Sequence, residues 1–170
     1  MAKNSPARGG PRDKRYWLIK SEPEVYSIDD LASDGRTEWD GVRNYQARNY
    51  MRDEMKVGDL VLFYHSNASP PGVAGIARVC SEAHADATQF DPKSDYYDPK
   101  ATEDDPRWSL VDVEFVERFE EPVSLETLKA DAKALDGMMV IKRGVRFSVQ
   151  PVEPKHFARV LALAGAKTKP

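Results

Sequence analysis

One unbroken apolar run, residues 60–64 (LVLFY), constrains the fold more than any other part of the sequence. It follows a Gly-Asp turn and precedes a loop that contains two consecutive prolines. A half-exposed strand alternates apolar and polar residues, so a continuous run is typical of a strand covered on both faces. Residues 73–79 form a predicted returning strand, in which Gly75 leaves room for a bulge or a close backbone approach. The sequence therefore predicts a sheet with further structure packed around it.

The remaining elements are short and irregularly ordered. Strands are predicted at residues 15–20, from Trp108 onward and at 145–149, and helices from the Ser27 N-cap, over 45–55 and from Glu153-Pro154. The apolar stripe of the last helix predicts that His156 faces solvent. Because the order is not a regular βαβ repeat, the pattern predicts an α+β fold with a small, mostly antiparallel sheet or open barrel flanked by short helices.

Charge divides the chain into a basic start and an acidic body. The 170 residues hold 25 Lys and Arg against 28 Asp and Glu, a net charge of −3. Residues 1–15 carry +4, so the other 155 carry about −7. An acidic body argues against coating a long duplex, which needs a broad basic face, but it allows a small site for one nucleotide. We expect a disordered basic tail at 1–14, one domain at 15–165 and a frayed end at 166–170.

Signals for catalysis, metals and membranes are missing from the sequence. It has no nucleophile elbow, no phosphate-binding glycine loop and no paired histidines at metal-ligand spacing. Residues 91–98 resemble a calcium loop but lack its central glycine and closing glutamate. No apolar run is long enough to span a membrane, and no secretory signal is visible. We therefore expect an intracellular protein (cytoplasmic, or nuclear in a eukaryote), not an enzyme, with no cofactor, metal or membrane partner.

Aromatic and polar side chains near predicted element ends suggest a recognition pocket instead. Trp39 lies in a polar loop, where a tryptophan serves equally well as a stacking platform or as a core anchor. Polar residues at strand and helix ends can converge on one cleft and offer both donors and acceptors to a base edge. These residues are Lys20, Ser21, Glu22, Asn44, Ser66, Asn67 and Arg143. For Asn44, a helix N-cap is the alternative reading.

Several motifs, in order along the chain, resemble the EVE domain. The stretches are 17–23 (WLIKSEP), 39–48 (WDGVRNYQAR), 57–60 (VGDL), 63–67 (FYHSN), 75–77 (GIA), 97–100 (YDPK), 106–108 (PRW) and 146–152 (RFSVQPV). The similarity runs from about Tyr16 to Leu163 and is more specific than any short motif. It implies a PUA-like fold, a small twisted barrel flanked by helices, related to the YTH readers of methylated adenine in RNA.

The resemblance also implies a pocket for a modified nucleobase, with modified cytosine in DNA proposed for EVE domains. Trp39 is similar to the first wall of the YTH aromatic cage, and Lys20-Ser21 to the pair that closes the first strand beside that pocket. The base-binding residues expected from these motifs are Lys20, Ser21, Glu22, Trp39, Asn44, Tyr64, Ser66, Asn67, Trp108 and Ser148. Trp108 fits either the pocket or the core. Arg43, Arg48, Arg143 and Arg146 are the expected phosphate contacts.

The sequence therefore predicts a monomeric, non-catalytic module that binds nucleic acid carrying a modified base, in DNA or RNA. Two alternatives stay open. One is an enzyme that acts on a modified base, with Glu22 as its candidate acid or base. The other is a protein-interaction module that uses the acidic loop at 91–105.

Overall fold

The computed structural model describes residues 13–170, so the predicted tail lies almost wholly outside the described residues. The strands are β1 (Tyr16–Ser21), β2 (Arg36–Glu38), β3 (Leu60–His65), β4 (Gly72–Val79), β5 (His84–Ala85), β6 (Ser109–Leu110), β7 (Asp112–Ser124) and β8 (Val149–Val152). The α-helices are α1 (Ile28–Asp34), α2 (Tyr45–Asn49), α3 (Leu125–Ala130) and α4 (Pro154–Ala164). Single turns of other helix types are η1 (Tyr50–Glu54), η2 (Ala87–Phe90) and η3 (Met139–Ile141).

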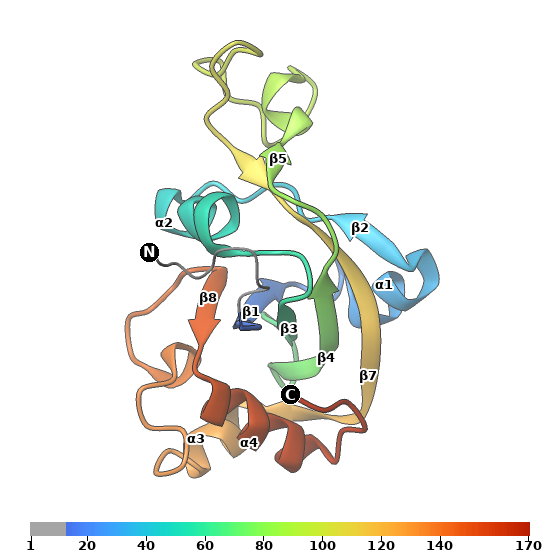
Figure 1. The fold of residues 1–170 in the computed structure, drawn as a ribbon, viewed down its shortest axis with the longest axis vertical. Helices are drawn as coiled ribbons and strands as arrows, with labels where there is room; N and C mark the ends of the chain where they lie inside the picture. The colour runs from blue at the N-terminus through green and yellow to red at the C-terminus, as the bar shows by residue number, and fades with distance from the viewer. Residues whose placement is uncertain (1–12) are drawn as a thin grey trace, which may run out of the picture.

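Six strands form one mixed sheet in the order β2-β7-β4-β3-β1-β8. The β1–β3 pair is parallel, and the other pairs in this sheet are antiparallel. The sheet curls into a half-barrel, with the long strand β7 sweeping along one side and α3 and α4 at one end (Figure 1). The predicted α+β fold with a small, mostly antiparallel sheet is confirmed.

β3 is buried on both faces, as its apolar run predicts. Val61 and Phe63 belong to a core that also holds α1 and α2 residues. Leu60, Leu62 and Tyr64 belong to a second core, on the other face, which is completed by α3 and α4. Burying one apolar side chain of this size contributes about 1.5–3 kcal/mol, so the five apolar residues of this strand stabilise the cores on both faces of the sheet.

Gly75 in β4 marks the place where the sheet bends. A Cβ at this position would lie 2.3 Å from the carbonyl oxygen of Glu117 and 2.8 Å from Cγ1 of Ile28, distances that no side chain tolerates. The pairing of β4 with both neighbours shifts register close to this residue. The close backbone approach predicted at Gly75 is therefore confirmed.

Three local predictions are wrong. The last strand begins at Val149 and not at 145, and as an edge strand paired only with β1 it accommodates Pro151. His156 is not on the solvent side: it is 1% exposed, and the turn that contains Gly137 comes close to its ring. The predicted frayed end is tied down at Lys167 and Thr168, whose backbone amides donate to the Glu117 carboxylate at 2.9 Å.

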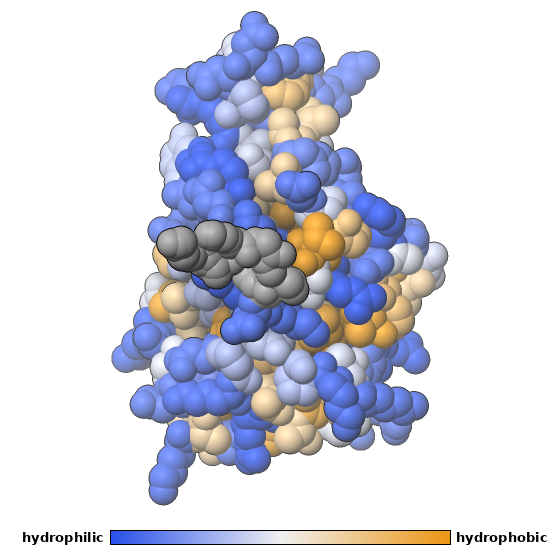
Figure 2. All heavy atoms as spheres, viewed as in Figure 1, coloured by the Kyte–Doolittle hydropathy of each residue, from blue (hydrophilic) through white to orange (hydrophobic). Residues whose placement is uncertain are grey.

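Residues 81–107 form a long excursion that leaves the sheet through β5 and projects beyond α2 (Figure 1). Its visible surface is mostly hydrophilic (Figure 2). The fully buried Gln89 holds it together, because its amide nitrogen donates to the carbonyls of Asp86 and Trp108, both at 2.7 Å. Its amide oxygen accepts from the backbone nitrogens of Arg107 and Trp108 at 2.8 and 2.9 Å. The excursion is therefore a folded substructure, closed at its base by one side chain.

In the part of the chain that the structure describes, none of the helices has the length and apolar character required to cross a membrane.

Candidate functional site

A cavity of about 710 Å³ opens where the parallel strands β1 and β3 end. Parallel strands finish at the same edge of a sheet, which brings Lys20, Ser21 and Glu22 close to Ser66. The turn before α1, the segment 37–43, Tyr96 of the excursion, and Arg146 and Ser148 before β8 complete the lining. The sheet topology thus gathers segments that lie far apart in the sequence around one concavity.

Trp39 belongs to both the core and the cavity. Its side chain lines the cavity, although the residue is only 8% exposed. The indole packs edge-on against Phe63, with ring centroids 5.4 Å apart, and against Tyr26 at 6.2 Å. Its backbone nitrogen donates to the Val111 carbonyl at 3.0 Å, which continues the β2–β7 pairing by one residue. The two roles left open by the sequence, platform and core anchor, are therefore combined in one ring.

Tyr96 supplies a second aromatic wall that depends on a glycine. A Cβ at Gly41 would lie 2.6 Å from Cζ of Tyr96, so the tyrosine ring rests directly on the glycine backbone. The φ angle of Gly41 is +83°, which also favours glycine. The Arg43 guanidinium donates two hydrogen bonds to the Tyr96 carbonyl, at 2.7 and 3.1 Å. The excursion thereby closes one side of the cavity.

Asp86 is the buried charge that fixes this wall. It is 1% exposed, and its carboxylate accepts from the Gly41 amide at 2.8 Å and from the Arg43 guanidinium at 3.1 Å. It also accepts from the Thr88 amide at 2.9 Å and the Thr88 hydroxyl at 2.5 Å. Burial acts to raise the pKa of Asp86, but these hydrogen bonds outweigh it and hold the pKa below its ordinary value. One carboxylate thus joins the excursion to the segment that lines the cavity.

The cavity has a cationic part and an acidic part. Burial, and then the neighbouring Arg146 guanidinium, lowers the pKa of the Lys20 ammonium. Burial, and then the carboxylates of Asp86 and Glu38, raises the pKa of Asp40. A ligand that carries an anion and hydrogen-bond donors would complement both parts.

Tyr26 adds a neutral polar group to the cavity lining. Burial, and then a hydrogen bond donated to Asp34 at 2.8 Å, raises the pKa of its phenol to about 12. Its phenol therefore stays protonated at neutral pH.

Six of the ten predicted base-binding residues line this cavity: Lys20, Ser21, Glu22, Trp39, Ser66 and Ser148. The other four lie elsewhere. Asn44 caps α2 through a hydrogen bond accepted from the Ala47 amide at 2.9 Å, and Tyr64 is buried in the core on the α3–α4 side. Asn67 donates to the Glu22 carboxylate at 3.0 Å from outside the lining, and Trp108 stacks on Tyr45.

The four predicted phosphate contacts divide in the same way. Arg43 and Arg146 line the cavity, whereas Arg48 and Arg143 do not. Arg43 is engaged by Asp86 and the Tyr96 carbonyl, so its position is fixed by the protein itself. Arg146 therefore remains, with Lys20, as the cationic pair of the cavity.

Sequence reasoning missed the contributions of Tyr26, Asp86, Gln89 and Tyr96. The one available signal was the length of the excursion at 81–107, which is unusual unless such a segment is functional or mobile. Sequence alone does not show that a side chain from this segment reaches back to Gly41.

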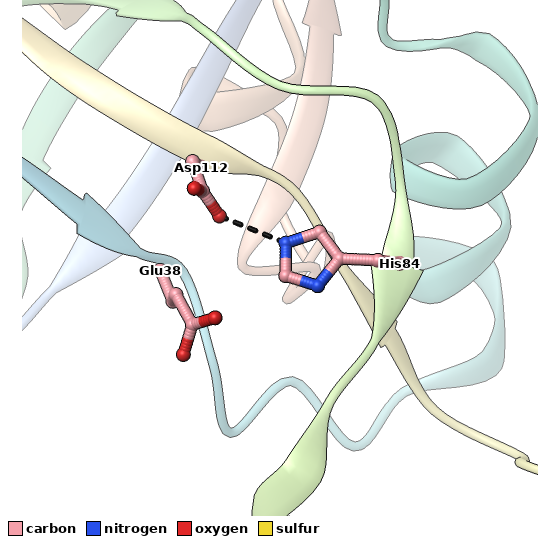
Figure 3. Close-up of side chains that lie close together, drawn as sticks. All are labelled: Glu38, His84 and Asp112. Atoms are coloured by element: carbon pink, nitrogen blue, oxygen red, sulfur yellow. Dashed lines mark hydrogen bonds and ion pairs between the residues drawn. The ribbon is translucent and has the colours of Figure 1, made fainter.

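An ionic cluster that shares Glu38 with the cavity lining also contains His84 and Asp112, and its three residues come from β2, β5 and β7 (Figure 3). Their ligand-type atoms lie within 4.8 Å of one another. His84 Nε2 is 2.9 Å from one Asp112 oxygen, and Arg36 donates to the other at 2.8 Å. Burial opposes it, but these two hydrogen bonds lower the pKa of Asp112. A cation would have to displace Arg36, so we interpret the cluster as an ion-pair network.

Comparison with known proteins agrees with this fold. Residues 15–163 match the family model described as the EVE domain. Thymocyte nuclear protein 1 of Mus musculus is 42% identical, over 91% of this chain and 76% of its own length. A structure of a hypothetical protein from Leishmania major is 49% identical with a TM-score of 0.85, covering 90% of this chain and 96% of that chain.

Two further structures place the fold in context. A crystal structure of human THYN1 protein in complex with DNA containing 5-methylcytosine is 40% identical, with a TM-score of 0.84, and covers 92% of this chain and 100% of that chain. The Mmi1 YTH domain, at 12% identity and a TM-score of 0.52, shares the fold alone. The relationship to YTH domains expected from the motifs is therefore confirmed at the level of fold.

Proposed function

Because the chain belongs to the EVE domain family, we propose that its cavity binds a modified nucleobase within a nucleic acid, with 5-methylcytosine in DNA as the first candidate. The observation that carries this proposal is the composition of the cavity, which combines aromatic walls, a cationic pair and carboxyl groups. The human relative solved with DNA containing 5-methylcytosine supports the choice of base.

The dimensions and chemistry of the cavity suit a base taken out of its strand. Ligand pockets commonly enclose about 300–1,000 Å³, and this cavity encloses about 710 Å³. Stacking of one base on an aromatic ring contributes about 1–3 kcal/mol, which offsets the cost of unstacking. Trp39 or Tyr96 provides such a surface.

The polar groups suit the edge of cytosine. The exocyclic amino group of cytosine donates hydrogen bonds, and carboxylates are its usual protein acceptors. Glu38 and Asp40 supply carboxyl groups in the lining, while Val25 and Val42 supply apolar surface for a methyl group. Lys20 and Arg146 would hold the phosphate, which positions the strand without reading its sequence.

We propose that the module binds without catalysis, as a monomer located in the cytoplasm, or in the nucleus of a eukaryote. One observation favours an enzyme as a second candidate: Asp40 has a raised pKa inside the cavity, as general acids often do. Incubation with modified oligonucleotides, followed by mass spectrometry of the nucleosides, separates the two. Conversion of the base would establish the enzyme, whereas a binder leaves it unchanged.

The main test is a titration of labelled oligonucleotides that differ only in one 5-methylcytosine, with N6-methyladenine as a further arm. Burying one methyl group contributes about 0.8 kcal/mol, so we expect a preference of about fourfold from this contact alone. Equal affinity for the modified and unmodified strands would overturn modification reading.

Paired arginine variants locate the site. Arg146→Met removes a cation from the cavity, and Arg118→Met removes a cation that is 62% exposed and paired with Asp29 elsewhere. We expect the first variant to weaken binding and the second to leave it unchanged. Equal effects of the two variants would place binding outside the cavity.

A further inference from the structure

Tyr45, the first residue of α2, is an exposed aromatic ring that lies outside the cavity lining. It is 50% exposed and stacks on the buried Trp108, with ring centroids 4.7 Å apart and planes 18° from parallel. In an edge-to-face contact, the edge of the tyrosine ring would point at Trp108 and neither of its faces would lie parallel to the indole. The near-parallel stack instead lays the ring flat on Trp108 and presents its second face outward.

The Arg48 guanidinium does not cover that outer face. The guanidinium carbon of Arg48 lies 4.7 Å from the centroid of Tyr45 and 5.8 Å from the centroid of Trp108. A group on the far face of Tyr45 would lie at about twice the Tyr45–Trp108 centroid distance of 4.7 Å from Trp108, well beyond the 5.8 Å found for Arg48. Arg48 therefore stands beside the two-ring stack, and among residues 13–170 the outer face of Tyr45 stays accessible.

The charge beside this stack is positive and only partly compensated. Arg48 donates to the Asn49 amide oxygen at 2.8 and 3.1 Å and to the Arg107 carbonyl at 2.7 Å, which are neutral acceptors. Arg107 donates to the Tyr45 hydroxyl at 3.2 Å and lies 3.9 Å from the Asp98 carboxylate. Burial, and then the nearby Arg52 cation, lowers the pKa of Arg48, and the Asp53 carboxylate offsets this only in part.

Arg43 connects this surface to the cavity. Its side chain belongs to the cavity lining, while its guanidinium carbon lies 5.3 Å from the centroid of Trp108. The same carbon lies 5.5 Å from the ring of Tyr96, the second aromatic wall. Arg43 therefore lies close to both the stack and the second aromatic wall of the cavity.

Resting on the proposed function, we propose that the outer face of Tyr45 stacks a nucleobase that neighbours the base in the cavity, while Arg48 and Arg107 contact the phosphate of that nucleotide. A flat ring accepts any base, because every base has a π face, so this subsite adds affinity without adding sequence preference. Arginine suits the phosphate because its planar donor group matches the geometry of phosphate oxygens. The acidic body supplies little long-range attraction, which makes such a local contact important for holding a strand.

The experiment compares ligands that do or do not reach beyond the cavity. The affinity of 5-methyldeoxycytidine and of single-stranded heptamers with one central 5-methylcytosine is measured for the wild type, Tyr45→Ala and Tyr45→Phe. Tyr97→Ala is the matched control, because Tyr97 is a similarly exposed tyrosine on the excursion. Thermal unfolding of each variant checks that it is folded.

We expect Tyr45→Ala to weaken heptamer binding by roughly ten- to a hundredfold, the equivalent of one lost stacking contact. The nucleoside affinity should change less than twofold, and Tyr45→Phe, which keeps the flat ring, should bind the heptamer like the wild type. A loss shared by Tyr97→Ala, or an equal loss for nucleoside and heptamer, would overturn the subsite. If the wild type binds no modified ligand, the proposed function fails; if it binds and Tyr45→Ala has no effect, only the subsite fails.

The phosphate contact has its own readout. The logarithm of the affinity falls linearly as the logarithm of the salt concentration rises. In Arg48→Met this fall should be less steep, with a slope smaller in magnitude by about one, because one phosphate is no longer neutralised. Arg118→Met is again the control and should leave the slope unchanged. An unaltered slope in Arg48→Met would remove Arg48 from the interface, even where the variant is less stable.

Discussion

Replacing Asp86 with alanine tests how strongly one buried carboxylate supports the cavity. The change leaves four donors without their acceptor: the Gly41 amide, the Arg43 guanidinium, and the amide and hydroxyl of Thr88. Removing one partner of a buried ion pair typically costs about 3–5 kcal/mol. The side chain of Arg43 is 22% exposed, so water can solvate it in part, and we expect a loss near 3 kcal/mol.

Urea unfolding followed by tryptophan fluorescence measures this loss. A change of about 3 kcal/mol corresponds to a fall in Tm of roughly 6–12 °C for a domain of this size. Asp104→Ala is the control, because Asp104 is an exposed carboxylate on the same excursion, and it should stay within about 0.5 kcal/mol of the wild type. A loss below about 1 kcal/mol for Asp86→Ala would refute the assignment of Asp86 as the support of the cavity wall.

The pH dependence gives an independent check on the same residue. The pKa of Asp86 is lower in the folded protein than its ordinary value of 3.8. Its stabilisation is therefore fully present above pH 3.8 and disappears as the pH falls through the lower, folded-state pKa. The difference in stability between the wild type and Asp86→Asn should be constant near neutral pH and shrink only in strong acid. A difference that already shrinks between pH 7 and 5 would contradict this account.

Four further substitutions probe the core, the wall and the charge of the site. Trp39→Ala should lower the free energy of unfolding by about 3–5 kcal/mol and abolish the preference for a modified base, as denaturation and oligonucleotide titration would measure. Gly41→Ala should cost about 1–3 kcal/mol and weaken binding, because its Cβ would meet the Tyr96 ring in a left-handed backbone conformation; unchanged values for both would contradict the contact. His156→Phe should raise the free energy of unfolding by about 1 kcal/mol in calorimetry, because both ring nitrogens are buried and neither has a hydrogen-bond partner among residues 13–170, the Glu153 carboxylate being 4.0 Å from Nδ1. Oligonucleotide affinity should fall as the pH rises toward 10.5, because a lowered pKa makes Lys20 lose its proton early, and Lys20→Met should lack that part of the decrease.

The parts of the fold that follow local rules could be predicted from the sequence. The apolar run of β3 and the Ser27 N-cap each depend on residues that are neighbours in the chain, and Gly75 signals a close approach through its residue type, although the groups that approach it, Glu117 and Ile28, are distant in sequence. His156 could not be placed, because the turn near Gly137 that comes close to its ring belongs to a different segment. The last strand lies at 149–152, later than its β-favouring run indicated, because it pairs as an edge strand that tolerates Pro151.

The candidate site was predictable where it is formed by element ends and unpredictable where it is formed by long-range packing. Lys20, Ser21 and Ser66 come together because two parallel strands end at one edge. Tyr96 reaches the cavity only through the network of Asp86 and Arg43, whose partners are more than forty residues apart. Trp39, for which the sequence left platform and core anchor equally open, lines the cavity, but its contacts with Phe63 and Tyr26 depend on long-range packing that its polar loop does not reveal.

The Trp39 indole packs in the core and also lines the cavity, and this limits how related proteins can change the ligand that they bind. A substitution that replaces this ring to admit a bulkier heterocycle also removes packing from the hydrophobic core, so it lowers the free energy of unfolding. Side chains at the mouth, such as Asp40 and Ser148, make no comparable contribution to the interior. New ligand preferences should therefore arise first through exchanges at the mouth, with the tryptophan retained.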